Sequence, residues 1–245
     1  MKKISCLVLA LALIFSLSAC GGKGGSSGNS KKNAAKSRAP SEAYEEYTKM
    51  KSTAYDSINE IISEHTELAL SVGLALFPIV SVDLTLIPLT MIGSDGGELA
   101  LAFLGMGNIK IDQNGDKYTI KYTDSKEVEM IQTCEFDAAA DSMRSIISDA
   151  AGSLETMIFE YTKSGDGYVS QYCMYQEQSG EYMLIKMYFN ADGDVAIGIE
   201  TVSSEPDSIY KKTGLTSDFA KNDSFFVLLQ AGKLTVTNNG ETKTY

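Results

Sequence analysis

The sequence predicts an α+β fold in which N-terminal helical segments cover one face of a curved antiparallel β-meander. Three observations support this prediction. Apolar and aromatic side chains recur at helical spacing after residue 41, and a second, strongly apolar stretch follows. From Asn108 onward apolar and polar residues alternate along short segments, and turn sequences such as QNGD, SGDG and NNGE separate these segments. A sheet with one apolar face must be covered, and the N-terminal half supplies the apolar cover.

The first helix is expected to begin at Ser41 as its N-cap and to stop at Pro78. The side chains that share its apolar face are Tyr44, Tyr47, Tyr55, Ile58, Ile62 and His65.

The stretch after this helix is apolar enough to raise the question of a membrane span. Asp83, Pro88 and the sequence GSDGGE interrupt it, so no run reaches the ~20 residues that a spanning helix needs. We therefore expect LALSVGLALF and LTLIPLTMIG to fold back onto the sheet as a helical hairpin or a broken helix. A segment that dips into a membrane is the alternative.

The strands are predicted from period-two alternation, which is clearest in DKYTIKYTD, where Tyr118, Ile120 and Tyr122 share one face. EPDSIYKK is expected to form a short helix with Pro206 near its start, and FFVLLQAGKLTV a closing hairpin. The same apolar face is expected to continue through Val128, Met130, Cys134, Phe136, Met157, Phe159, Tyr161, Met183, Ile185, Met187, Phe189, Val195, Ile197 and Ile199.

The expected organisation has three parts. Residues 1–19 form a signal peptide, residues 20–40 a flexible tether, and residues 41–245 a single domain. Within the domain we expect a helical cap over 41–106, the meander over 107–202, and the short helix and hairpin over 203–245.

The N-terminus carries the most specific motif of the chain. Lys2 and Lys3 precede an apolar run, and Leu17-Ser18-Ala19-Cys20 closes it. These four residues resemble the lipobox of bacterial lipoproteins. The resemblance implies that Cys20 is lipidated on its sulfur, becomes the mature N-terminus and anchors the protein on the extracytoplasmic side of the cell membrane. Two acyl chains suffice for stable anchoring.

Charge separates the tether from the domain. Residues 21–40 hold five basic residues and no acidic one, whereas the chain from Ser41 onward holds all 32 acidic residues against 14 basic ones. A basic tether is attracted to anionic head groups while the acidic domain is repelled from them. So acidic a domain also argues against nucleic acid as a partner.

The sequence predicts neither an enzyme nor a metal or cofactor site. G-x-S-x-G occurs once, in the tether, where no strand or helix can hold a strained nucleophile. His65 is the single histidine and is expected on the polar edge of the helix. The loop from Asp112 has Lys117 where a calcium loop needs Gly.

Two functions remain open. One is a non-enzymatic lipoprotein with a structural or protein-contact role. The other is a carrier or sensor of a lipid-like apolar ligand, similar in outline to the LolA-like lipoprotein carriers, with the ligand held between helices and sheet. The candidates for its lining are Met130, Phe136, Met157, Phe159, Met183 and Met187.

The domain contains two cysteines, Cys134 and Cys173, which an oxidising compartment would favour as a disulfide. Their strands are expected to lie three steps apart in the meander, which is roughly 14 Å. A disulfide needs Cα atoms within about 7 Å, so we expect two free thiols.

Overall fold

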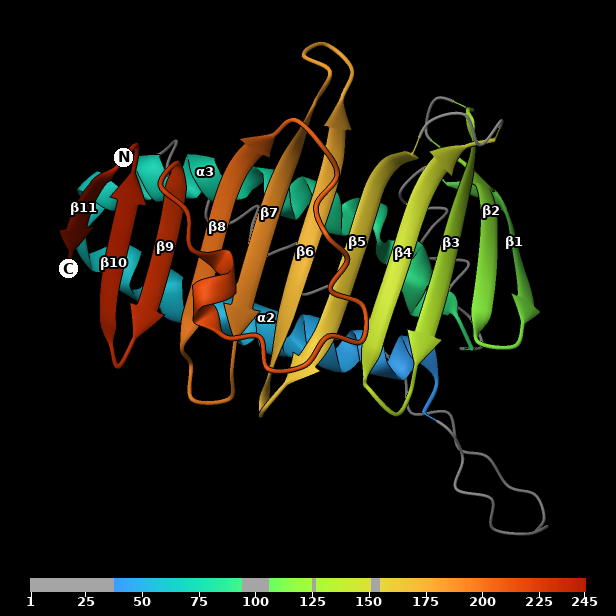
Figure 1. Cartoon of the computed structure of the whole chain (residues 1–245), viewed down its shortest axis with the longest axis horizontal. Helices are drawn as coiled ribbons and strands as arrows, with labels where there is room; N and C mark the ends of the chain where they lie inside the picture. Colours follow the sequence, from blue (N-terminus) through green and yellow to red (C-terminus); the bar gives the residue numbers. More distant parts are fainter. Residues whose placement is uncertain (1–37, 94–105, 125–126, 151–154) are drawn as a thin grey trace, which may run out of the picture. The chain divides into compact units, whose positions relative to one another are not determined.

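The predicted α+β fold is confirmed by a computed structural model that describes residues 38–93, 106–124, 127–150 and 155–245. Two N-terminal helices pack on one face of an eleven-stranded antiparallel sheet (Figure 1). Cys20 and the rest of the signal and tether lie outside the described residues, as does the end of the predicted cap.

The helical layer contains α2 (Pro40–Glu64), α3 (Thr66–Thr85) and the short 3-10 helix η2 (Ile87–Met91). The two long helices meet at His65, whose extended backbone ends one helix and starts the next. The break was expected at Pro78, which instead lies inside α3. Burial of Ile79 and Val80 beside it outweighs the roughly 3 kcal/mol that an interior proline costs a helix.

The start of α2 also differs from the prediction. Its N-cap is Ala39 and Pro40 occupies the first turn, so Ser41 lies inside the helix and is buried. The Glu42 carboxylate accepts a hydrogen bond from the Ala39 N–H at 3.2 Å, which satisfies a donor that the helix leaves open.

Among the helices of the described residues, none combines the length and the apolar character that a bilayer crossing requires. LALSVGLALF lies in α3 and LTLIPLTMIG runs from the end of α3 through η2. The side chains that these segments bury include Leu68, Val72, Leu76, Leu86, Leu89, Met91 and Ile92.

The sheet is a meander in which every strand pairs antiparallel with its neighbours in sequence. Its strand order is therefore the chain order, as expected. The strands are β1 (Gly107–Asn114), β2 (Lys117–Thr123), β3 (Glu129–Asp137), β4 (Ser142–Asp149), β5 (Glu155–Ser164), β6 (Gly167–Gln176), β7 (Glu181–Phe189), β8 (Val195–Val202), β9 (Phe225–Gln230), β10 (Lys233–Asn238) and β11 (Glu241–Thr244).

The register places the predicted apolar face against the helices. Phe136 pairs with Met143, Met143 with Tyr161, and the row continues through β6 to β8. Val128 is the exception, because it precedes β3 and is 46% exposed. The predicted strand therefore begins too early, because Val128 still belongs to the turn that precedes β3.

Cys134 and Cys173 are free thiols on β3 and β6. The three-step separation is confirmed by the strand order. Cys134 pairs with Ser145 on the face toward the helices, whereas Cys173 lies in an apolar cluster with Ile158 and Leu184 on the other face. The body of the sheet therefore separates the two sulfurs.

The face of the sheet opposite α2 and α3, here called the outer face, carries one long connection. Residues 203–216, here called the strap, leave β8, cross the outer face and return through the 3-10 helix η3 (Ser217–Ala220) to β9 (Figure 1). The helix expected over EPDSIYKK is absent. One turn bond, from the Lys212 N–H to the Ile209 carbonyl, forms within it, and the N–H groups of Ile209 and Lys211 bond to strand side chains instead of to a helical turn.

Candidate functional site

The candidate site is the interface between α2, α3 and the centre of the sheet. One stripe of α2 faces the strands, and its members recur every three or four residues, as one face of a helix requires. They are Tyr44, Tyr47, Lys51, Tyr55, Ile58 and Ile62, all of them buried.

Tyr47 occupies the centre of this interface and is fully buried. Its ring stacks on Tyr161 with centroids 4.7 Å apart and meets the ring of Tyr168 edge-on at 5.6 Å. The rings of Phe159 and Phe189 lie 5.7 and 5.4 Å away. Such aromatic pairs contribute roughly 0.5–1.5 kcal/mol each beyond the area they bury, so α2 is held firmly at this point.

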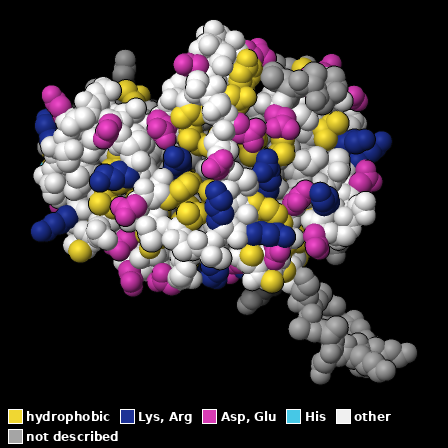
Figure 2. Space-filling view, viewed as in Figure 1, with side chains coloured by type: hydrophobic (Ala, Val, Ile, Leu, Met, Phe, Trp, Pro, Cys, Tyr) yellow, Lys and Arg dark blue, Asp and Glu magenta, His cyan; other side chains and the backbone are white. Residues whose placement is uncertain are grey.

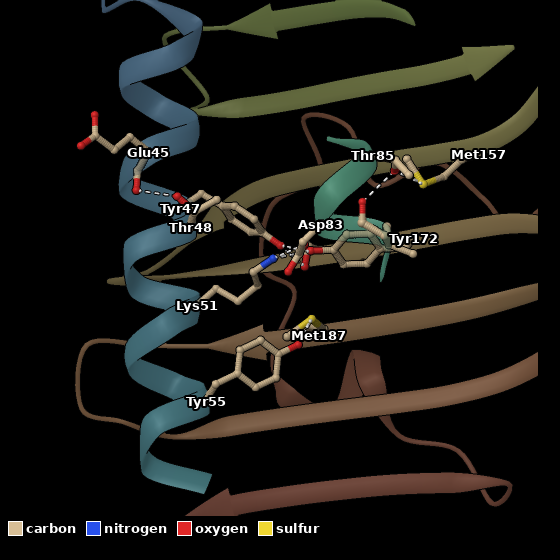
Figure 3. Close-up of polar contacts among 12 residues, drawn as sticks. Glu45, Tyr47, Thr48, Lys51, Tyr55, Asp83, Thr85, Met157, Tyr172 and Met187 are labelled. Atoms are coloured by element: carbon tan, nitrogen blue, oxygen red, sulfur yellow. Dashed lines mark hydrogen bonds and ion pairs between the residues drawn. The ribbon is translucent and has the colours of Figure 1, made fainter. Parts of the chain in front are cut away.

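A polar network crosses the same interface (Figure 3). The Tyr47 hydroxyl donates to Ser170 Oγ at 2.9 Å and lies 2.7 Å from the Tyr172 hydroxyl. Lys51 Nζ donates to the Tyr172 hydroxyl at 3.2 Å and forms an ion pair with Asp83 of α3. Three elements are thereby joined: α2, α3 and β6.

Burial governs the ionisation of these groups. It raises the pKa of the Tyr47 and Tyr172 hydroxyls, which stay protonated and serve as hydrogen-bonding groups. Burial also raises the pKa of the Asp83 carboxyl, and the Lys51 ammonium offsets part of that rise. A buried charge costs several kcal/mol unless it is paired and hydrogen-bonded, and Lys51 has both kinds of partner.

Methionines border the network. The Tyr55 hydroxyl points at Met187 Sδ at 3.8 Å, and the Thr85 hydroxyl points at Met157 Sδ at 3.6 Å (Figure 3). Sulfur is a weak acceptor, so these contacts add little energy. They show that both methionines face the helices.

The six predicted lining residues share this helix-facing side of the sheet. Phe159 and Met187 are fully buried, Phe136 and Met157 nearly so, and Met130 and Met183 are partly buried. Phe159 meets the rings of Tyr44 and Tyr47. The centre of the interface is therefore filled by side chains of the helices.

Sequence reasoning missed the polar members of the interface. Lys51 lies in the middle of the aromatic stripe at helical spacing, which is a signal that could have identified it. Asp83 was read as an interruption of an apolar run. Ser170 and Tyr172 alternate on β6 with Val169, Gln171 and Cys173, so both faces of this strand are buried and alternation does not show which face meets the helices.

Gln132 and Ser145 form a second buried polar pair on the same face, toward β3 and β4, with Gln132 Nε2 donating to Ser145 Oγ at 2.9 Å. The alternation of β3 places Gln132 between Met130 and Cys134, so periodicity alone could have placed it in the interior.

His65 lies at the junction of the helices, and its ring meets Tyr245 edge-on at 5.3 Å. Within the described ranges, no three His, Cys, Asp or Glu side chains gather in a way that could hold a metal ion.

Comparison of the chain with family models, with characterised proteins and with solved structures finds no match in any of the three. The function must therefore be inferred from the chain itself. The interface joins the helical layer to the sheet through Tyr47 and Lys51, whose polar groups are engaged by Ser170, Tyr172 and Asp83. Such an arrangement makes the interface rigid and fixes how the helices lie on the sheet.

Proposed function

We propose that this protein is a membrane-anchored extracytoplasmic lipoprotein whose domain acts as a non-enzymatic protein-contact module. The anchor is Cys20, which ends the lipobox-like sequence from Leu17. A basic tether behind it carries an acidic domain with a net charge of about −18. The tether is attracted to the membrane surface and the domain is repelled from it, which keeps the domain available to a partner.

The observation that supports the contact role best is the closed network around Tyr47 and Lys51. Satisfied buried networks make a structure rigid and specify a single arrangement. A helical layer tied to the centre of the sheet leaves the outer face as a preorganised platform, and preorganised surfaces bind with a smaller entropic cost.

Metabolic labelling with an alkyne fatty acid tests the anchor. We expect label on the unaltered chain and none on Cys20→Ala, which should leave the membrane fraction. Cys6→Ala is the matched control, because this cysteine lies in the same signal segment, and it should be labelled like the unaltered chain. Label and membrane retention in Cys20→Ala would contradict the proposal.

A photo-reactive residue tests the contact role in cells. Lys212 is exposed on the strap, and Ser81 is exposed on α3, which lies on the other side of the sheet. We expect one discrete cross-linked species from position 212 and none from position 81. A chain that cross-links at neither position would contradict a contact role and favour a purely structural one.

A carrier or sensor of an apolar ligand is the second candidate. Its support is the shared side of Met130, Phe136, Met157, Met183 and Met187, since methionines adapt to irregular ligands. Such a ligand would have to displace the rings around Tyr47. Native mass spectrometry of protein purified from membranes tests it: a retained lipid mass beyond the anchor supports the carrier, and its absence contradicts it.

A further inference from the structure

The connection between β8 and β9, which includes the strap, is much longer than the fold requires. β8 and β9 are neighbouring antiparallel strands, which a turn of two residues can join. Residues 203–224 instead leave the end of β8, run across the outer face over the centre of the sheet and come back to β9 (Figure 1). The meander does not need this excursion for its topology.

Side chains of the outer face bind the strap through its backbone. Five of them, from three adjacent strands, each contact one backbone group of the strap. Glu160 and Ser142 accept from the N–H groups of Ile209 (2.7 Å) and Lys211 (2.9 Å), whereas Gln171, Thr162 and Ser164 donate to the carbonyls of Asp207 (3.1 Å), Lys212 (3.1 Å) and Leu215.

Glu160 is the centre of this arrangement. Its side chain is fully buried on β5, although it belongs to the outer face. Arg144 and Gln171 of the sheet approach it at 3.1 and 2.7 Å. The strap supplies the other two donors, the Ser208 hydroxyl at 2.5 Å and the Ile209 N–H. A buried carboxylate needs such donors, so the site favours occupation by a chain that offers a hydroxyl and an N–H.

Little apolar burial holds the strap down. Ile209 is the strap's buried side chain, and most of the others are exposed or half-buried. Figure 2 shows charged side chains of both signs spread over this face. Segments with few buried apolar contacts open at lower free energy than strands of the core, so the strap is expected to open before the sheet.

We propose that the outer face of β4, β5 and β6 is a docking track for an extended polypeptide segment, and that the strap occupies this track as an internal competitor. The partner segment carries a hydroxyl residue followed by an aliphatic one, as Ser208 and Ile209 do. Recognition of an extended backbone is a general mode of peptide binding, with side-chain pockets adding specificity. The inference rests on the proposed protein-contact role and names the surface and the class of partner.

Hydrogen exchange on the full unaltered chain is the first test. We expect the amides of Ile209 and Lys211 to exchange at least ten-fold faster than the paired amides of β5 and β6. Equal rates would mean that the strap opens only when the sheet unfolds, and this would overturn the proposal.

Peptide binding is the second test. The probe is a fluorescent peptide with the strap sequence EPDSIYKKTGL, followed by anisotropy. Ser208→Ala with Ile209→Ala loosens the strap and leaves the track intact. Because a site that is open only part of the time binds with reduced apparent affinity, this variant should bind the peptide at least ten-fold more tightly than the unaltered chain.

Two controls make the result specific. Adding Glu160→Gln should weaken peptide binding at least ten-fold, whereas Glu177→Gln, which alters an exposed glutamate of the β6–β7 hairpin, should not change it.

A scrambled peptide that binds the loosened variant equally well would overturn the proposal. If the double variant is unfolded by circular dichroism, Ser208→Ala alone replaces it. If position 212 cross-links to a partner but the peptide does not bind, the protein-contact role stands and the proposed docking track is wrong.

Discussion

Lys51 of α2 and Asp83 of α3 form an ion pair inside the interface between the helices and the sheet, with the lysine side chain only 2% exposed. The pair joins two helices that are consecutive in sequence but separated by the break at His65. The Tyr172 hydroxyl accepts a further hydrogen bond from the same ammonium, so the pair also fixes both helices to β6.

Replacing Lys51 by Met should destabilise the protein by up to about 3–5 kcal/mol, because Asp83, whose side chain is only 18% exposed, then keeps its charge without its cationic partner. Urea denaturation followed by circular dichroism measures the change. The control is Lys117→Met, which breaks an ion pair with Glu135 where the lysine is 70% exposed, and its cost should stay below about 1 kcal/mol. Equal costs would contradict the role given to the buried pair.

The cost of Lys51→Met should depend on pH. Lys51 holds down a carboxyl pKa that burial raises, so its removal raises the folded-state pKa of Asp83 further. The destabilisation should be full above that pKa and should shrink as the pH falls toward the unfolded value, because protonation removes the unpaired charge. Denaturation curves from neutral to acidic pH test this. A cost that grows toward acidic pH would contradict it.

Cys134 and Cys173 should both be alkylated after denaturation without reductant. Burial raises the pKa of the Cys134 thiol and brings that of Cys173 to about 11, so both should react slowly in the folded state. Peptide mass spectrometry of folded and unfolded samples gives the two extents of reaction. A linked peptide pair would show that the strand order is wrong.

Gly198→Ala should displace η3 from the outer face. A Cβ at this position would lie 1.8 Å from the Ala220 carbonyl oxygen, which is too close for any atom. We expect a loss of about 1–3 kcal/mol, as for other overpacked sites, together with faster hydrogen exchange in residues 217–222. Gly73→Ala in α3 is the control, since a Cβ there meets no atom within 4 Å. The stability of the Gly73→Ala variant should not fall.

Much of the fold could be predicted because alternation and helical spacing are local properties of the backbone. Tyr118, Ile120 and Tyr122 had to share a face once residues 117–123 formed a strand, and Asn-Gly and Asp-Gly had to turn. A meander then needs no further information about strand order. The placement of Met157, Phe159 and Met187 on the covered face followed from the same rule.

The helix boundary and the strap could not be predicted in this way. Pro78 is a local stop signal, yet packing of its neighbours carries α3 through it. EPDSIYKK has a helix-like start, yet its backbone binds Glu160 and Ser142. In both places, contacts between residues distant in sequence outweigh a local preference of a few kcal/mol.

The sequence by itself determined the class of fold, the covered face of the clearly alternating strands and the difference in charge between residues 21–40 and the chain from Ser41 onward. Only the tertiary structure decided that Lys51 meets Asp83 and that Ser208 meets Glu160. These partners are 32 and 48 residues apart. Their encounter depends on where whole elements return in space, and no periodicity of a single element encodes that position.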